Sequence, residues 1–107
     1  MKNITQEEWR EKTAQDDNAV ILDVRTQNEV DEGIIPGAVT DMDFYEGQGF
    51  IEKLNNLDKS KNYYVYCRSG NRSGQAAQLM GQLGFDEVYN LLGGMNEWDG
   101  ETVDAED

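Results

Sequence analysis

Three short apolar runs, separated by segments with helical spacing, constrain the fold of this chain more than any other feature. They occupy residues 19–24, 63–67 and 87–92. The first is interrupted only by Asp23 and is typical of a strand buried in a parallel sheet. The second is rich in aromatic and β-branched residues, as strands are. Strands that alternate with helices form parallel βαβ units, so we predict an α/β fold: a small parallel sheet with helices on both faces.

Helix-start signals lie just before the segments that we predict to be helical. Thr5 precedes Glu8 by three residues, and Thr26 precedes Glu29 in the same way, which is the pattern of a capping box. Gly84 is expected to end the longest of these helices. The predicted helices cover residues 5–15, 26–33, 50–57 and 72–83, with a last helical turn at 95–98 and a very short strand at 38–40.

The chain has 107 residues, the usual length of one domain. We predict a single domain over residues 1–107, with its core at about residues 4–99. Residues 100–107 form an acidic tail, and the end of the chain is expected to be frayed.

Asp23 lies within an apolar strand, where a carboxylate invites a catalytic interpretation. We favour local pairing, for instance with Arg25, because buried charges are usually paired.

The charge of the chain excludes some classes of partner. It has 22 acidic and 9 basic residues and no histidine, for a formal net charge of −13. Nucleic acids and anionic membranes both reward a basic surface, so neither is an expected partner. Acidity of this kind commonly serves solubility. It also repels small anionic substrates at long range, so any anion site has to be made locally.

Cysteine and histidine counts limit the chemistry further. Cys67 is the only cysteine, so no internal disulfide is possible. Without histidine the chain lacks a ligand set for a structural zinc site, and a Cys–His catalytic pair is excluded. The longest apolar run near the amino terminus, Ala19–Leu22, is too short to span a membrane, and no signal peptide is recognisable. We therefore expect a cytoplasmic location, which would keep a lone thiol reduced.

Cys67 lies where a predicted strand passes through a short loop into a predicted helix. Such a loop points several free backbone N–H groups into one concavity, and the helix dipole adds partial positive charge there. Gly70 permits the backbone to turn where a Cβ would clash, and Asn71 also tolerates left-handed angles. The pattern predicts an anion cradle around the Cys67 sulfur and a lowered pKa for its thiol.

The alternative is that Cys67 is a small buried apolar residue at a strand end, which is the usual role of a lone cysteine. The neighbouring arginines, glycine and helix start favour the functional interpretation. Two of these neighbours, Arg68 and Arg72, would supply positive charge at the rim or to an oxyanion. The candidate site residues are Cys67 as the catalytic nucleophile and Arg68, Ser69, Gly70, Asn71 and Arg72 as substrate-binding residues, with no metal ligands.

At this point the sequence resembles the rhodanese family in its single-domain form. The segment 67–73, Cys-Arg-Ser-Gly-Asn-Arg-Ser, is similar to the family's active-site loop. Residues 22–25 followed by Glu29 resemble its first motif, and residues 33–38 resemble its second. Residues 84–98 are similar to its closing motif. The resemblance covers roughly residues 4–99.

The resemblance implies a sulfurtransferase that works by a ping-pong reaction. The Cys67 thiolate would take a sulfane sulfur from a donor such as thiosulfate and form a persulfide, and cyanide or another thiol would remove that sulfur. The backbone of residues 68–72 would cradle the persulfide. No metal or organic cofactor is expected. The partners implied are a small sulfur-donor anion, a thiol or cyanide acceptor, or a sulfur-relay protein.

Two positions depart from the family's pattern: Ile34 replaces a usual histidine, and Val30 replaces a usual aromatic residue. Neither position supplies the nucleophile. Three alternatives stay open: a regulatory or sulfur-relay module, a cysteine phosphatase and an inactive structural domain. The phosphatases that resemble this family have a loop one residue longer. The short spacing from Cys67 to Arg72 and the intact cysteine favour the sulfurtransferase.

Overall fold

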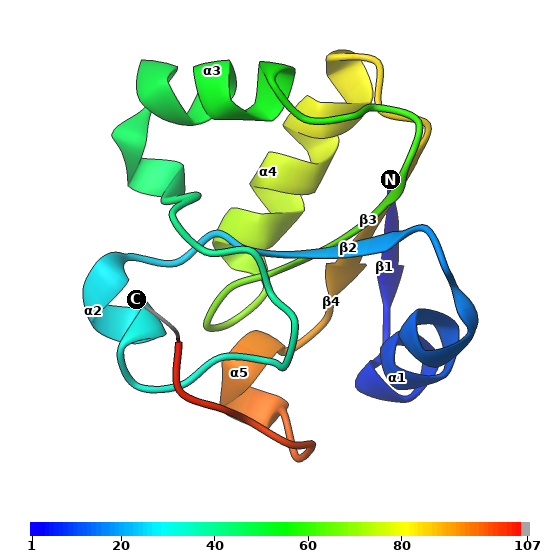
Figure 1. Ribbon diagram of the computed structural model, residues 1–107, viewed down its shortest axis with the longest axis vertical. Helices are drawn as coiled ribbons and strands as arrows, with labels where there is room; N and C mark the ends of the chain where they lie inside the picture. The colour runs from blue at the N-terminus through cyan, green and yellow to red at the C-terminus, as the bar shows by residue number, and fades with distance from the viewer. Residues whose placement is uncertain (106–107) are drawn as a thin grey trace.

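The computed structural model describes residues 1–105, which form one parallel sheet covered by helices (Figure 1). The sheet has four strands in the order β1-β4-β3-β2, and all neighbouring pairs are parallel. The elements in chain order are β1 (Lys2–Ile4), α1 (Gln6–Gln15), β2 (Ala19–Asp23), α2 (Gln27–Val30), the 3-10 helix η1 (Phe44–Glu46), α3 (Gln48–Asn55), β3 (Asn62–Tyr66), α4 (Asn71–Gln82), β4 (Glu87–Leu91) and α5 (Gly94–Glu97).

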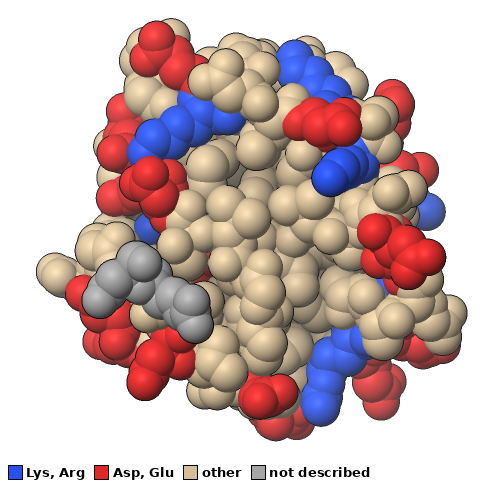
Figure 2. Space-filling view, viewed as in Figure 1, with Lys and Arg blue, Asp and Glu red and all other residues tan. Residues whose placement is uncertain are grey.

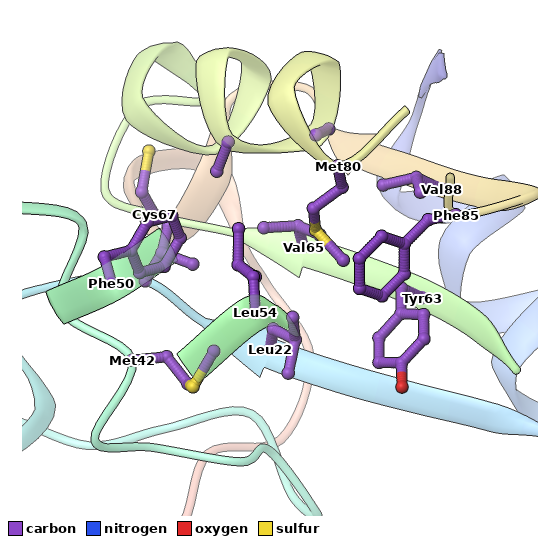
Figure 3. Close-up of a cluster of buried hydrophobic side chains, with 13 residues drawn as sticks. Leu22, Met42, Phe50, Leu54, Tyr63, Val65, Cys67, Met80, Phe85 and Val88 are labelled. Carbon is purple, nitrogen blue, oxygen red and sulfur yellow. The ribbon is translucent and has the colours of Figure 1, made fainter. Parts of the chain in front are cut away.

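Helices cover both faces of the sheet, as predicted. On one face, Phe50 of α3 and Met80 of α4 pack against Val65 of β3 (Figure 3). On the other, Trp9 of α1 packs against Tyr64 of β3, with Met95 of α5 alongside them. Alternate residues of β3 therefore feed opposite cores, because successive side chains of a strand point to opposite faces.

Local capping explains where two of the helices begin. Thr26 accepts a hydrogen bond from the Glu29 N–H, and the Glu29 carboxylate accepts one from the Thr26 N–H, so the predicted capping box is present. At α1, Thr5 accepts from the Glu8 N–H, which is half of the predicted box. The other boundaries of the predicted elements differ from the predictions by at most two residues, except that α2 ends at Val30, three residues before the predicted end.

The sequence-based prediction missed β1, which is three residues long and mostly polar. Its pairing with β4 places Asn3 beside Asn90, at one edge of the sheet. At the other edge, the predicted strand at 38–40 is reduced to a single parallel bridge between Val39 and Leu22. Both segments are too short to show the alternating pattern of apolar residues by which a strand is recognised in a sequence.

The expectation of a frayed tail is wrong for residues 99–103. Val103 forms a two-hydrogen-bond antiparallel bridge with Ile34, with N···O distances of 2.8 and 2.9 Å. Asp99 pairs with Arg10, and the Trp98 indole donates to the carbonyl of Glu101. Backbone pairing thus holds a polar segment that has little apolar surface of its own. Residues 106 and 107 of the predicted tail lie outside the described residues.

None of the helices in residues 1–105 is long and apolar enough to cross a bilayer.

The topology matters mainly for what it places at the carboxyl edge of the sheet. Ligands of open α/β sheets bind beyond that edge. Cys67 immediately follows β3, which is one of the two central strands.

Candidate active site at the carboxyl end of β3

The Cys67 sulfur lies inside the turn that joins β3 to α4. Its side chain points toward α4 (Figure 3), and the residue is fully buried beneath an exposed loop. The Gly70 N–H lies 3.2 Å from the sulfur and the Ser73 N–H 3.4 Å, and the Ser73 hydroxyl oxygen is 3.3 Å away. The predicted convergence of backbone N–H groups on Cys67 is therefore present.

Two opposing effects act on the pKa of the Cys67 thiol. Burial raises it, because a thiolate is poorly solvated there. Hydrogen bonds from the backbone N–H groups of Ser73, Gly70 and Ser69 favour the thiolate and lower the pKa. The hydrogen bonds prevail, so the pKa lies below its ordinary value. This activation requires no histidine, in agreement with the sequence-based expectation.

Gly70 gives the loop its shape. Its φ of +97° lies in the left-handed region, and a Cβ at this position would lie 3.1 Å from the Leu91 carbonyl oxygen. Asn71, the other residue expected to tolerate left-handed angles, does not adopt them and is instead the first residue of α4. Gly70 thus makes the sharp entry into the helix, which leaves the first N–H groups of α4 free to face the sulfur.

The loop is also held from behind by α5. The N–H groups of Met95 and Asn96 donate to the carbonyl oxygens of Cys67 and Arg68, at 3.0 and 2.9 Å. Gly94 lies so close that a Cβ there would be 2.5 Å from the Cys67 carbonyl oxygen. α5 therefore fixes the carbonyl groups of the loop, while the N–H groups of the loop face the Cys67 sulfur.

Arg72 is bound within the protein rather than free at the rim. Its two terminal nitrogens donate to the two carboxylate oxygens of Glu29, each at 2.8 Å, and the ring of Tyr45 covers its guanidinium at 5.2 Å. Only 15% of the Arg72 side chain is exposed. The bidentate hydrogen bond from Arg72 holds the pKa of Glu29 at about 2.

Arg68 is the more accessible of the two predicted cations, with 54% of its side chain exposed. Its Nε lies 3.2 Å from Glu29, and a terminal nitrogen lies 3.8 Å from Glu32. Two acidic residues therefore offset the two arginines of the loop. The side chains of Ser69 and Asn71 contact neighbouring loop and helix atoms, with no hydrogen bond to the Cys67 sulfur within residues 1–105.

The prediction that Asp23 pairs locally with Arg25 is confirmed. The buried carboxylate accepts hydrogen bonds from the Arg25 guanidinium and from the Tyr66 hydroxyl. Arg25 also donates to the Gly33 carbonyl, and the Ile35 N–H donates to the Tyr66 oxygen. This cluster ties the segment after α2 to the ends of β2 and β3, so its role is structural.

Sequence reasoning missed Asn90 as part of the site. It is buried on β4, where its carboxamide oxygen accepts from the Ser73 hydroxyl at 2.6 Å. Its nitrogen donates to the Gly70 carbonyl at 3.1 Å and to Asn3 at 2.9 Å. A buried amide in an apolar strand was the available signal.

At the two positions that depart from the family pattern, Val30 and Ile34 are buried, and Ile34 carries the bridge to Val103.

Comparisons with known proteins agree with this geometry. The Rhodanese-like domain family model matches residues 5–101. YtwF of Bacillus subtilis, whose name describes a sulfurtransferase, is 41% identical over 103 residues, which are 95% of this chain and 94% of that protein. YrkF of the same species, whose name describes a sulfur carrier, is 37% identical over 92% of this chain and 51% of its own length.

A solved structure supports the same assignment. The Rhodanese-like Domain Protein from Staphylococcus aureus superposes with a TM-score of 0.83 at 30% identity, over 99% of this chain and all of that one. The sequence match, the structural match and the strand–loop–helix around Cys67 involve the same residues, and together they place this chain in the rhodanese-like domain family.

Proposed function

We propose that this protein is a sulfurtransferase that carries sulfane sulfur as a persulfide on Cys67. The thiolate attacks the outer sulfur of a donor such as thiosulfate, a new S–S bond forms, and sulfite leaves with the electron pair of the broken bond. An acceptor such as cyanide or a thiolate then attacks the outer sulfur of the persulfide. The electron pair of that S–S bond returns to Cys67, which regenerates the thiolate.

One observation carries the proposal: backbone N–H groups converge on the Cys67 sulfur at the start of α4. Such groups stabilise the thiolate before attack and favour anionic sulfur during transfer. The names of the relatives are consistent with this chemistry. Because Cys67 is fully buried, a donor can reach it only when side chains at the loop surface move, and Arg68 and Ser69 are the exposed residues next to it in the loop.

The paired arginines favour a second candidate, a sulfur relay between proteins. Arg72 is bound to Glu29 on both nitrogens, and Arg68 shares Glu29 and lies near Glu32. This arrangement leaves little uncompensated positive charge for a free dianion such as thiosulfate. A protein-bound persulfide brings its own contacts and needs less charge at the loop. In this case small molecules would turn over slowly.

The test is the intact mass of the protein after brief incubation with thiosulfate and then with cyanide. We expect a gain of about 32 daltons that cyanide removes, as thiolate–disulfide chemistry at a single reactive cysteine predicts. Cys67→Ser, which changes one buried atom, should fold and show no gain. A gain in that variant would rule out Cys67 as the carrier.

The two candidates separate in the same assay. Formation of the Cys67 persulfide by thiosulfate on the timescale of one catalytic turnover would support the small-molecule enzyme. Loading only by a persulfidated protein donor, with thiosulfate inert, would support the relay. If the correctly folded wild type took sulfur from neither source, the sulfurtransferase proposal would fail.

A further inference from the structure

A buried chain of polar side chains runs from Cys67 through Ser73 to Asn90 and connects α4 to β4. The Ser73 hydroxyl oxygen lies 3.3 Å from the Cys67 sulfur and 2.6 Å from the Asn90 carboxamide oxygen. All three residues are almost completely buried. A hydroxyl carries a single hydrogen, so Ser73 can donate to one of these two acceptors at a time.

The orientation of the Asn90 amide is set by its other contacts. Its second polar atom lies 3.1 Å from the Gly70 carbonyl oxygen, which can only accept a hydrogen bond. The nitrogen of Asn90 must therefore face Gly70, and the oxygen must face Ser73. That oxygen accepts from no other group in residues 1–105.

The short distance indicates where the Ser73 hydrogen resides. At 2.6 Å the contact with Asn90 lies at the short end of O–H···O distances, whereas the sulfur is a weak acceptor at 3.3 Å. With its hydrogen directed at Asn90, Ser73 presents a lone pair to Cys67. A lone pair stabilises a thiol, which can donate S–H to it, but offers nothing to a thiolate.

The loaded and unloaded states of Cys67 differ in what they require from Ser73. In a persulfide the inner sulfur is bonded to the outer one and bears no charge, so it needs no donor. In the unloaded thiolate the inner sulfur is negative and attracts the Ser73 hydrogen. Donating that hydrogen would leave the buried Asn90 oxygen without a partner, which is costly.

We propose that Asn90 is a positioning residue that retains the Ser73 hydrogen and thereby favours the sulfur-loaded state of Cys67 over the unloaded thiolate. The inference rests on the proposed function as far as the loaded state is concerned, but the competition for the hydrogen exists in the unloaded protein too. No hydrogen bond joins Asn90 to the sulfur within residues 1–105. It acts through Ser73, and β1 supports it through Asn3.

Charged and titratable groups also lie on the elements around this cluster. None of them makes a hydrogen bond to the Ser73 hydroxyl or to the Asn90 oxygen in the part of the chain that the structure describes. They are Arg72 on α4 and Arg68 on the loop with their partners Glu29 and Glu32, the Asp23–Arg25 pair and Tyr66 at the ends of β2 and β3, Tyr45 on η1, and Glu97 on α5.

The test measures thiolate formation at Cys67 as a function of pH in the unloaded protein. The signal is the ultraviolet absorbance of the thiolate, taken as the difference from Cys67→Ser, so that tyrosine ionisation cancels. Asn90→Ala should lower the midpoint by about one pH unit, because Ser73 is then free to donate to the sulfur. Ser73→Ala should leave the midpoint unchanged or lower it, because it removes an acceptor for the thiol.

The double variant isolates the hydroxyl from any loosening of the loop. In the Ser73→Ala background, Asn90→Ala should shift the midpoint no further, since no hydrogen remains to be released. Asn3→Ala, which removes a different hydrogen bond of the same amide, is the matched control and should not move the midpoint. If Asn90→Ala does not fold, the direction of the Ser73→Ala shift carries the test alone.

Two outcomes would overturn the inference. One is a midpoint that rises in Ser73→Ala, which would mean that Ser73 donates to the thiolate. The other is an equal shift by Asn90→Ala with and without Ser73. In the loaded protein, Asn90→Ala should release sulfur to cyanide about threefold faster, as a leaving thiol of lower pKa does. Absence of any loading would refute the proposed function while leaving the titration result intact.

Discussion

At the scale of single residues, Glu29 organises the charge around Cys67. It caps α2 through Thr26, receives both terminal nitrogens of Arg72 and approaches Arg68. One carboxylate on a four-residue helix therefore determines where both loop arginines lie. This arrangement explains how so acidic a chain keeps two cations beside its cysteine.

Replacing Glu29 tests this role through pH. Its pKa is held at about 2 against an ordinary 4.5, so its ion pair stabilises the fold above pH 4.5 and is lost as the pH falls from there toward 2. We expect Glu29→Gln to cost about 2 kcal/mol at pH 7 and progressively less between pH 4.5 and 3. Denaturant unfolding at several pH values measures this difference.

The matched control is Glu52→Gln, which removes an exposed carboxylate from α3. Its effect on unfolding should be small and nearly independent of pH. If Glu29→Gln kept its full destabilisation at pH 3, the ion pair would not be the source of the stability.

Arg68 is the loop cation with room to meet an incoming anion. Arg68→Ala should raise the KM for thiosulfate about fivefold and leave stability nearly unchanged, because the exposed pairs of Arg68 contribute little to folding. Lys61→Ala removes the same charge at the opposite end of β3 and serves as the control. Steady-state kinetics of both variants measure the KM for thiosulfate. Equal changes in KM would mean that net charge, and not the position of Arg68, causes the effect.

At the scale of elements, the site depends on how α5 meets the loop after β3. Helices of four residues have little stability of their own, so contact with the loop holds α5 in place. The contact is made by backbone groups, from the N–H groups of Met95 and Asn96 to the carbonyls of Cys67 and Arg68. It requires a residue without a side chain at Gly94.

Gly94→Ala tests this contact. The added Cβ would lie 2.5 Å from the Cys67 carbonyl oxygen, at a φ of +52° that disfavours any side chain. We expect a loss of about 2–3 kcal/mol in the free energy of unfolding and a marked loss of sulfur loading, because the cradle must shift.

Gly81→Ala provides the comparison for the same chemical change. Gly81 lies within α4, where an added Cβ meets no atom within 4 Å. This variant should gain about 0.5–1 kcal/mol and load sulfur normally. Similar losses in the two variants would argue against a specific contact between α5 and the loop.

At the scale of the whole molecule, the net charge of −13 sets the conditions for stability. Figure 2 shows acidic side chains around the margin of one face, with fewer Lys and Arg residues among them. Like charges at this density repel one another in the compact state, and salt screens the repulsion over distances beyond about 10 Å at 0.1 M.

We therefore expect NaCl to stabilise the protein. Raising its concentration from about 0.05 to 0.5 M should increase the Tm by about 4 °C, equivalent to roughly 1 kcal/mol for a domain of this size. Calorimetry measures the Tm, and KCl at equal ionic strength should give the same increase. A Tm that falls with salt would mean that local ion pairs outweigh the net repulsion.

Elements whose signal lies in their own residues could be predicted from the sequence. Apolar runs and helical spacing located β2, β3, β4 and α4 because each element buries apolar residues at the spacing of its own secondary structure. The turn from β3 into α4 was predictable because Gly70 and the helix start are adjacent to Cys67. The 3-10 helix η1, the strand β1 and the pairing of Val103 with Ile34 were not, because each is short and stabilised by a distant partner.

By itself, the sequence determined an α/β chain with one cysteine at the end of a strand, in a loop whose N–H groups face its sulfur. These features need only neighbours in the chain. Only the tertiary structure decided that Glu29 binds Arg72 across 43 positions and that Asn90 reaches Ser73 across 17. Hydrogen bonds and ion pairs form wherever packing brings partners within about 3 Å, and no periodicity in the sequence records them.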